Sequence, residues 1–191
     1  MKHFKQPNVV SFGEVLFDCY ADRYYLGGAP LNFAWNLSQF NFSVSIVSAV
    51  GKDKLGIKLR KFLKNTNLDQ TFISERPEAT GTVDVSLING EADFLIKQNV
   101  AWDHIKLPNI LNLRPKLIYF GTVAQRTKQN RMTLSRMFDL NPKHLFYDVN
   151  LRPGHNFQEI ILEGLKRATI LKLTNEEWKV IQEITNLKTP S

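Results

Sequence analysis

"YYLGGAPLNFAWNLSQF", residues 24–40, joins an apolar run to a helical pattern through two adjacent glycines. Pro30 suits the first turn of a helix, because the N–H group that proline lacks would have no partner there. The apolar residues that follow are spaced for one buried helix face, which predicts a helix over residues 30–40. Taken alone, the glycine pair also fits an ordinary turn, and Asn32 also fits a helix cap.

Strands and helices alternate along the rest of the chain. Apolar, β-prone runs predict strands at residues 9–17, 43–50, 117–122, 145–149 and 169–173, and helical spacing predicts helices at residues 54–64, 128–140, 157–167 and 175–184. Such alternation requires parallel crossovers, so it predicts an α/β fold with a doubly wound parallel sheet. No internal repeat or linker interrupts the pattern, and residues 1–191 are therefore expected to form one domain.

Residues 80–97 break this rhythm. "TGTVDVSLINGEADFLIK" alternates apolar and polar residues around Asn89 and Gly90. Asn-Gly favours the tight turn of an antiparallel hairpin, because both residues tolerate positive φ. Alternation also indicates that one face of the hairpin lies outside a standard core. We therefore expect a hairpin that projects from the main sheet.

Polar residues and glycines gather where the first predicted strand ends. Asp18 is expected to close that strand, and Gly27 and Gly28 precede the helix that carries Asn32. In open parallel sheets, ligands bind at the carboxyl ends of the strands. Glycine lets a backbone approach a ligand closely, and an amide side chain offers both a donor and an acceptor. Together these groups predict a site for a polyhydroxyl compound, although Asp18 alone also fits a cap or a surface residue.

Composition narrows the expected partners and location. The formal net charge of +7 favours an anionic partner, but the lysines and arginines are scattered, which indicates a solvated basic surface rather than nucleic-acid binding. Cys19 is the single cysteine, so no internal disulfide can form, and this fits a reducing cytoplasm. No apolar run is long enough to span a membrane, and the first residues lack the features of a signal peptide.

Other signatures of nucleotide and metal sites are missing from the sequence. No G-x-G-x-x-G follows a strand, and neither a G-x-x-x-x-G-K-[ST] loop nor a G-x-S-x-G elbow occurs. His3, His104, His144 and His155 are too scattered for a metal cluster. A nucleotide-dependent oxidoreductase is therefore disfavoured.

Several motifs in order resemble the PfkB family of carbohydrate kinases, which includes ribokinase and fructokinase. The motifs are "GEVLFD" (13–18), "GGAPLNFA" (27–34), "VGKDKLG" (50–56), "TGTVDVSLINGEADF" (80–94), "VAWD" (100–103), "YFGTVAQR" (119–126), "DVNLRP" (148–153) and "LKLTNEEW" (171–178). They run through nearly the whole chain and are most similar to the fructokinase-like branch. Asn41 departs from the first signature, where a Gly or Ser is usual.

The resemblance implies a ribokinase-like, three-layer fold with a small β-lid built from about 18–26 and 80–100. It implies that Asp18, Gly27, Gly28 and Asn32 hold sugar hydroxyl groups, and that Lys97 faces the substrate, although a solvated lysine fits equally. Lids exclude water and complete a site. Relatives often form dimers through the lid, and Val83, Val85 and Leu87 are the residues expected to form such a homodimer interface here.

The resemblance also implies a phosphate side to the site. Asn150 and Arg152 are expected near the transferred phosphate or the sugar, and an arginine suits phosphate oxygens. A turn stabilised by Asp148 is the alternative for these two residues. Glu177 aligns with the glutamate of an N-x-x-E motif that orders water around Mg²⁺, although Thr174 stands in place of the asparagine and an exposed helix-start glutamate is the alternative. ATP and Mg²⁺ are thus the expected cofactors.

One family motif occurs nowhere in the 191 residues. It is the D-T-x-G-A-G-D loop, whose last aspartate is the general base and whose glycine amides stabilise the phosphoryl group. The resemblance therefore implies a C-terminally truncated form, the sugar-binding and lid-bearing part of an ATP-dependent kinase of fructose or a related ketose, inactive alone. The alternative is a truncated, non-catalytic pseudokinase that binds sugar or a protein partner.

Overall fold

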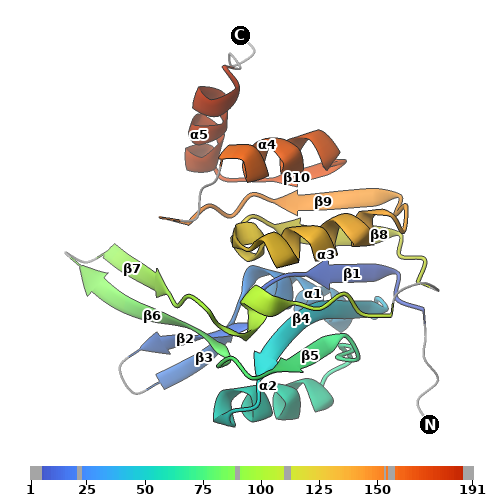
Figure 1. Ribbon diagram of the computed structural model, residues 1–191, viewed down its shortest axis with the longest axis vertical. Coiled ribbons are helices and arrows are strands. Elements are labelled where there is room, and N and C mark those ends of the chain that lie inside the picture. The colour runs from blue at the N-terminus through green and yellow to red at the C-terminus, as the bar shows by residue number, and fades with distance from the viewer. Residues whose placement is uncertain are drawn as a thin grey trace.

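A six-stranded parallel sheet forms the centre of the structure (Figure 1), a computed structural model that describes residues 6–20, 23–88, 91–109, 113–152, 154 and 158–186. In spatial order its strands are β10 (Ile170–Lys172), β9 (His144–Asp148), β8 (Leu117–Gly121), β1 (Val9–Phe12), β4 (Val44–Gly51) and β5 (Ile73–Arg76). The chain therefore winds outward from β1 in both directions, which confirms the doubly wound α/β fold.

Helices cover both faces of this sheet. They are α1 (Ala29–Gln39), α2 (Lys54–Lys64), α3 (Lys128–Phe138), α4 (Gln158–Arg167) and α5 (Asn175–Thr185), with short 3₁₀ turns η1 (Ala101–His104) and η2 (Val123–Arg126). Successive residues of β1 serve opposite cores, since Val9 clusters with Leu31 of α1 and Val10 clusters with Leu134 of α3. The result is three layers. Within the described residues, no helix has the length and apolar character needed to cross a bilayer.

A second, four-stranded sheet, which we call the lid, projects to one side of the central sheet (Figure 1). Its order is β3 (Arg23–Gly27), β2 (Leu16–Tyr20), β6 (Gly81–Ile88) and β7 (Glu91–Ile96). The pairs β2–β3 and β6–β7 are antiparallel, whereas β2 and β6 run parallel. Residues 80–97 thus form the hairpin that their alternating pattern predicts, with Asn89 and Gly90 outside the described residues.

The prediction of one strand over residues 9–17 is wrong. The chain leaves the central sheet after Phe12 and enters the lid at Leu16. Asp18 therefore lies in the middle of a lid strand and does not close a strand of the central sheet. Residues 9–17 are all buried, on both sides of the break, so periodicity alone does not reveal where the chain leaves the central sheet.

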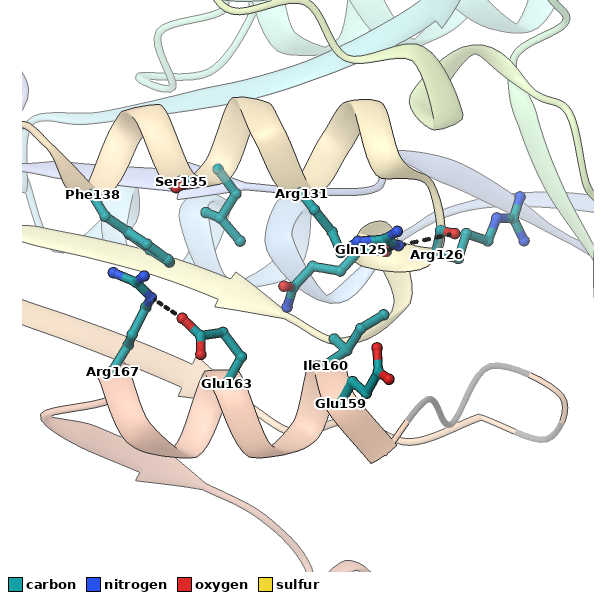
Figure 2. Close-up of a pocket in the computed structure, with 10 residues that line it drawn as sticks. Gln125, Arg126, Arg131, Ser135, Phe138, Glu159, Ile160, Glu163 and Arg167 are labelled. Atoms are coloured by element: carbon teal, nitrogen blue, oxygen red, sulfur yellow. Dashed lines mark hydrogen bonds and ion pairs between the residues drawn. The ribbon is translucent and has the colours of Figure 1, made fainter.

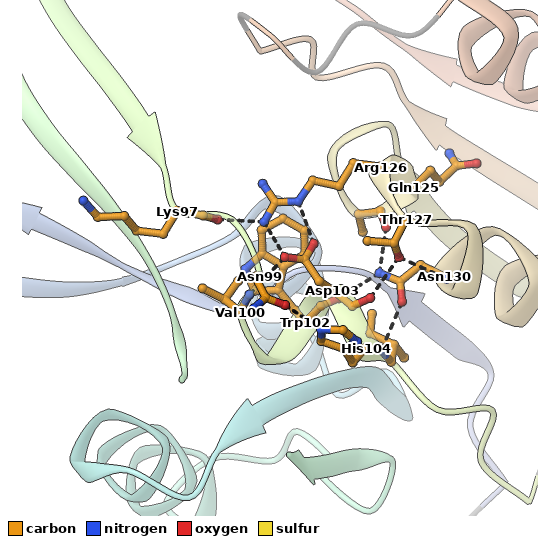
Figure 3. Close-up of polar contacts among 12 residues, drawn as sticks. Lys97, Asn99, Val100, Trp102, Asp103, His104, Gln125, Arg126, Thr127 and Asn130 are labelled. Carbon is orange, nitrogen blue, oxygen red and sulfur yellow. Dashed lines mark hydrogen bonds and ion pairs between the residues drawn. The ribbon is translucent and has the colours of Figure 1, made fainter. Parts of the chain in front are cut away.

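A buried ion pair fixes the base of the lid where β7 returns to the core (Figure 3). The Arg126 guanidinium donates to both carboxylate oxygens of Asp103, at 2.6 Å from Nε and 2.7 Å from Nη2. Nη2 also donates to the backbone carbonyl of Lys97 at 2.7 Å. The guanidinium stacks on Trp102, 3.9 Å from the ring centroid. This bidentate, stacked arrangement orients the lid over the carboxyl ends of the central strands.

Candidate functional site

A cavity of about 180 Å³ lies between the start of α1, the lid and the loop after β9. Among the residues predicted for a site, it brings together Asp18, Gly28, Asn32, Asn150 and Arg152. The other lining residues are Glu14, Leu16, Ala29, Val83, Phe94, Ile96 and Val123. Predictions made separately for residues 18–32 and residues 150–152 therefore converge on one site.

The two glycines of the opening motif make room for other parts of the protein. A Cβ atom at Gly27 would lie 2.5 Å from Oδ2 of Asp18, so a side chain there would displace that carboxylate. Gly28 has φ of +105°, and a Cβ atom there would lie 2.5 Å from the backbone oxygen of Glu14. The glycine pair therefore lets β2 and the β1–β2 connection pack tightly against the start of α1.

Asp18 and Asn32 approach the cavity from the lid and from α1. Burial raises the pKa of the Asp18 carboxyl, and the nearby charge of Arg152 lowers it. Asn32 is exposed in the first turn of α1, where its backbone N–H donates to the carbonyl of Gly28 at 3.0 Å. A carboxylate and an amide thus face the same space from two separate elements, an arrangement suited to hydroxyl groups.

Asn150 and Arg152 lie in the loop that follows β9, at the carboxyl edge of the central sheet. Asn150 has φ of +42°, a left-handed conformation that asparagine tolerates better than most residues. The Arg152 guanidinium lies 6.0 Å from the ring centroid of Phe94 in β7. The loop therefore reaches the lid across the cavity and brings a positive charge to it.

Glu177 anchors this loop. One of its carboxylate oxygens accepts from the N–H of Leu151 at 2.8 Å, and the other accepts from the N–H of Thr174 at 2.7 Å. The Thr174 hydroxyl accepts from the N–H of Glu177 in return, which completes a capping box at the start of α5. Glu177 is buried, so the alternative of an exposed helix-start glutamate is wrong.

The described residues contain no group of three or more His, Cys, Asp or Glu side chains that could hold a metal ion. A role for Glu177 in ordering water around Mg²⁺ remains a prediction. Its carboxylate already accepts two backbone N–H groups, so any further contact would use the remaining lone pairs.

Lys97 lies outside the cavity. Its ammonium group forms an ion pair with Asp84 in the lid, and both side chains are about half exposed. The structure does not bring Lys97 together with the other predicted residues, and its contact with substrate remains a prediction.

Val83 is buried, whereas the sequence had suggested that it is exposed on the lid. It is 4% exposed and lines the cavity, while Val85 is half-buried and the Leu87 side chain lies outside the described residues. The period of two identifies which residues share a face, but it cannot tell how far along that face burial extends.

Glu14 is a cavity residue that the sequence reasoning missed. It lies in the short connection between β1 and β2 and is 3% exposed. Burial raises the pKa of its carboxyl from 4.5 to about 7, against smaller lowering effects from backbone hydrogen bonds and Arg152. The only available signal was an acidic residue inside the apolar run 9–17. A charged residue among core residues is the kind of exception that marks a site.

A second cavity, of about 400 Å³, lies between α3 and α4 (Figure 2). Three of its charged groups already have partners within the protein: Arg167 pairs with Glu163 at 2.5 Å, and Arg131 donates to the backbone carbonyl of Gln125 at 2.8 Å. None of the predicted site residues lines it. We therefore take the smaller cavity under the lid as the candidate site.

Comparisons with known proteins agree with the fold and with the motifs. Residues 5–189 match the model of the pfkB family of carbohydrate kinases. A protein of Arabidopsis thaliana named probable fructokinase-6, chloroplastic, is 28% identical over 199 residues, which cover 91% of this chain and 52% of the relative. The chain spans about half the length of the first curated relatives that it matches.

Solved structures show the same architecture. An uncharacterized sugar kinase from Pyrococcus horikoshii, in complex with ATP, is 27% identical and superposes with a TM-score of 0.82, covering 92% of this chain and 66% of that chain. A fructokinase from Vibrio cholerae, in a form with bound fructose, ADP and calcium ion, superposes with a TM-score of 0.79 at 20% identity, covering 96% and 64% of the two chains. At that identity the second match shows the fold alone.

Glu14 predicts a pH dependence of stability. Between its ordinary pKa of 4.5 and its folded value of about 7, the folded state keeps a proton that the unfolded state has lost. The free energy of unfolding should therefore fall by about 3 kcal/mol as the pH rises through this range. Urea unfolding near pH 5 and near pH 8 measures the fall.

The variant Glu14→Gln should lose most of this pH dependence, because its side chain does not titrate. Glu159→Gln, at the exposed start of α4, is the control for the general effect of removing a carboxylate. An equally steep fall in Glu14→Gln would contradict the assignment to Glu14.

Proposed function

This chain belongs to the pfkB family of carbohydrate kinases, and we propose that it is the sugar-binding, lid-bearing part of an ATP-dependent kinase of fructose or a related ketose. The observation that carries the proposal is the cavity itself, where Asp18 and Asn32 face Asn150 and Arg152 beneath the lid. The names and bound ligands of the relatives support the same chemistry.

The cavity offers distinct groups for the two parts of such a reaction. The carboxylate of Asp18 and the amide of Asn32 suit sugar hydroxyl groups, and the guanidinium of Arg152 suits a phosphoryl group. The lid strands would exclude water from the reacting groups. ATP would supply the phosphoryl group, with Mg²⁺ held mainly by the phosphates of the nucleotide and Glu177 acting at most through water.

Loss of either hydroxyl-facing side chain should weaken binding of D-fructose. Asp18→Ala and Asn32→Ala should each cost about 1–3 kcal/mol of binding free energy, because each removes hydrogen bonds in a partly buried site. Isothermal titration calorimetry measures the change. Asn36→Ala, one turn further along the exposed side of α1, is the matched control and should bind like the unmutated chain. Unchanged affinity in both site variants would overturn the proposed site.

The 191 residues alone should not phosphorylate fructose. They lack the D-T-x-G-A-G-D loop that supplies the family's general base and anion-stabilising amides. A coupled assay with D-fructose and Mg·ATP tests this expectation, and turnover that rises with protein and is lost in Asp18→Ala would contradict it. A downstream reading frame that encodes the loop would favour the kinase, whereas a stop codon would favour a non-catalytic sugar-binding protein.

We also propose a homodimer formed through the lid. The cavity face of the lid continues beyond the site into exposed aromatic residues, Tyr20, Tyr25 and Phe94. The register supports this assignment, because Tyr25 is opposite Asp18 in the β2–β3 pair. The rings of Tyr20 and Tyr25 pack edge to face, 5.6 Å apart. Exposed aromatic clusters of this kind are typical of protein interfaces.

A cytoplasmic location of the chain also remains a prediction.

Two neighbouring tyrosines provide a matched test of the dimer. Tyr25 is 51% exposed on the cavity face, whereas Tyr24 is 48% exposed and is opposite Cys19 on the other face. Tyr25→Glu should shift the chain to a monomer in analytical ultracentrifugation, because it buries a charge in the interface. Tyr24→Glu should leave association unchanged. A monomeric unmutated chain, or equal effects of the two variants, would contradict a dimer through this face.

A further inference from the structure

Four acidic side chains are buried among the described residues: Glu14, Asp103, Asp148 and Glu177. Three of them form ion pairs or hydrogen bonds within the protein. Asp103 pairs with Arg126, Asp148 accepts from Tyr119 and Lys172, and Glu177 accepts from two backbone N–H groups.

Glu14 differs from the other three. Its Oε2 is buried and has no hydrogen-bond partner within the described part of the chain. A buried acceptor without a donor is costly, so it calls for an explanation.

The surroundings of Glu14 point toward a ligand. Its side chain lines the cavity under the lid, together with Asp18 and Asn32. The carboxyl lies at the start of α1, where a backbone hydrogen bond from Ala29 favours its charged form. Gly28, the N-cap of that helix, has no side chain to occupy the position. The unpartnered oxygen thus lies beside the groups already expected to hold hydroxyl groups.

The charges around the cavity determine which kind of ligand group can form a hydrogen bond with Oε2 of Glu14. Glu14 and Asp18 both bring carboxyl groups to the cavity, and Asp148 lies close enough to Glu14 to raise its pKa. A phosphate group would meet repulsion in this corner, whereas a hydroxyl group can donate a hydrogen bond. The chemistry therefore fits a neutral polyol.

We propose that Glu14 is a further sugar-contacting residue, whose Oε2 accepts a hydrogen bond from one hydroxyl group of the bound ketose. The proposal rests on the proposed function and adds a ligand contact to it. It explains why a carboxyl is kept in a buried connection of three residues, and why one of its oxygens lacks a partner among the residues that the structure describes.

Sugar binding should change the protonation of the Glu14 carboxyl. A hydroxyl donor at Oε2 favours the charged carboxylate, so sugar binding should lower the pKa of Glu14 below about 7. Arg152 favours the ionisation of Glu14, whereas Asp148 opposes it. Two more titratable groups face this corner: Asp18, whose carboxyl lines the same cavity and whose pKa burial also raises, and Tyr119, whose pKa burial and Asp148 raise far above the range concerned. Sugar binding just below neutral pH should therefore release a proton, and affinity should rise with pH through this range.

Calorimetry on the unmutated chain tests the proton release without any variant. D-fructose is titrated near pH 6.5 in cacodylate and in imidazole, two buffers with very different heats of protonation. The observed enthalpies should differ by the heat of a fractional proton taken up by the buffer, and the difference should vanish near pH 8.5, where Glu14 is already charged. Equal enthalpies near pH 6.5 would overturn the proposal.

Variants then identify the contact. Near pH 8, Glu14→Gln should bind D-fructose about tenfold more weakly than the unmutated chain and should release no proton. Glu159→Gln, an exposed glutamate of α4, should behave like the unmutated chain in both respects. Circular dichroism establishes that each variant is folded.

A series of deoxyfructose analogues locates the hydroxyl group. The analogue that lacks the contacted hydroxyl should bind equally to the unmutated chain and to Glu14→Gln. If every analogue distinguishes the two proteins by the same factor as D-fructose, Glu14 contacts no hydroxyl group and the proposal is wrong. Absence of D-fructose binding by the unmutated chain would instead overturn the proposed function, and this inference with it.

Discussion

The shortness of one connection determines the geometry of the site. Three residues, 13–15, carry the chain from β1 of the central sheet into β2 of the lid. The lid must therefore start at the carboxyl edge of the central strand, where parallel sheets hold their ligands. The same three residues pass so close to Gly28 that a Cβ atom there would contact the backbone of Glu14. The sheet, the lid and the start of α1 thus meet at one point, and the cavity lies there.

The alternation of strands and helices could be predicted because buried parallel strands and amphipathic helices each leave a direct pattern in the sequence. The break within residues 9–17 could not, because all nine of these residues are buried and apolar residues stand on both sides of Gly13 and Glu14. The edge strand β5, Ile73–Arg76, carries only four residues, too few for a clear period. Glu14 was missed for a related reason, since its importance depends on burial, which the sequence does not report.

In the candidate site, too, the motifs could be predicted from their order along the chain, whereas the direction of individual side chains could not. Asp18 and Arg152 could be expected together, because the family resemblance assigns both of their motifs to one site for sugar and phosphate. The surroundings of Lys97 and Val83 depend on how the lid meets the central sheet, and there the structure differs from the expectation. Thr174 departs from the family's asparagine, yet it completes a capping box with Glu177, which also holds the loop after β9. Thr174 therefore helps Glu177 to hold in place the loop that lines the cavity.

We propose that a sugar binds under the lid beside Asp18 and Asn32. The most direct test is a series of ¹H–¹⁵N NMR spectra of the labelled chain during titration with D-fructose. We expect the largest shifts at the backbone N–H of Gly28 and the side-chain amide of Asn32, and unchanged signals from the α3–α4 cavity around Arg131. Shifts confined to the α3–α4 cavity, or none at millimolar sugar, would contradict it.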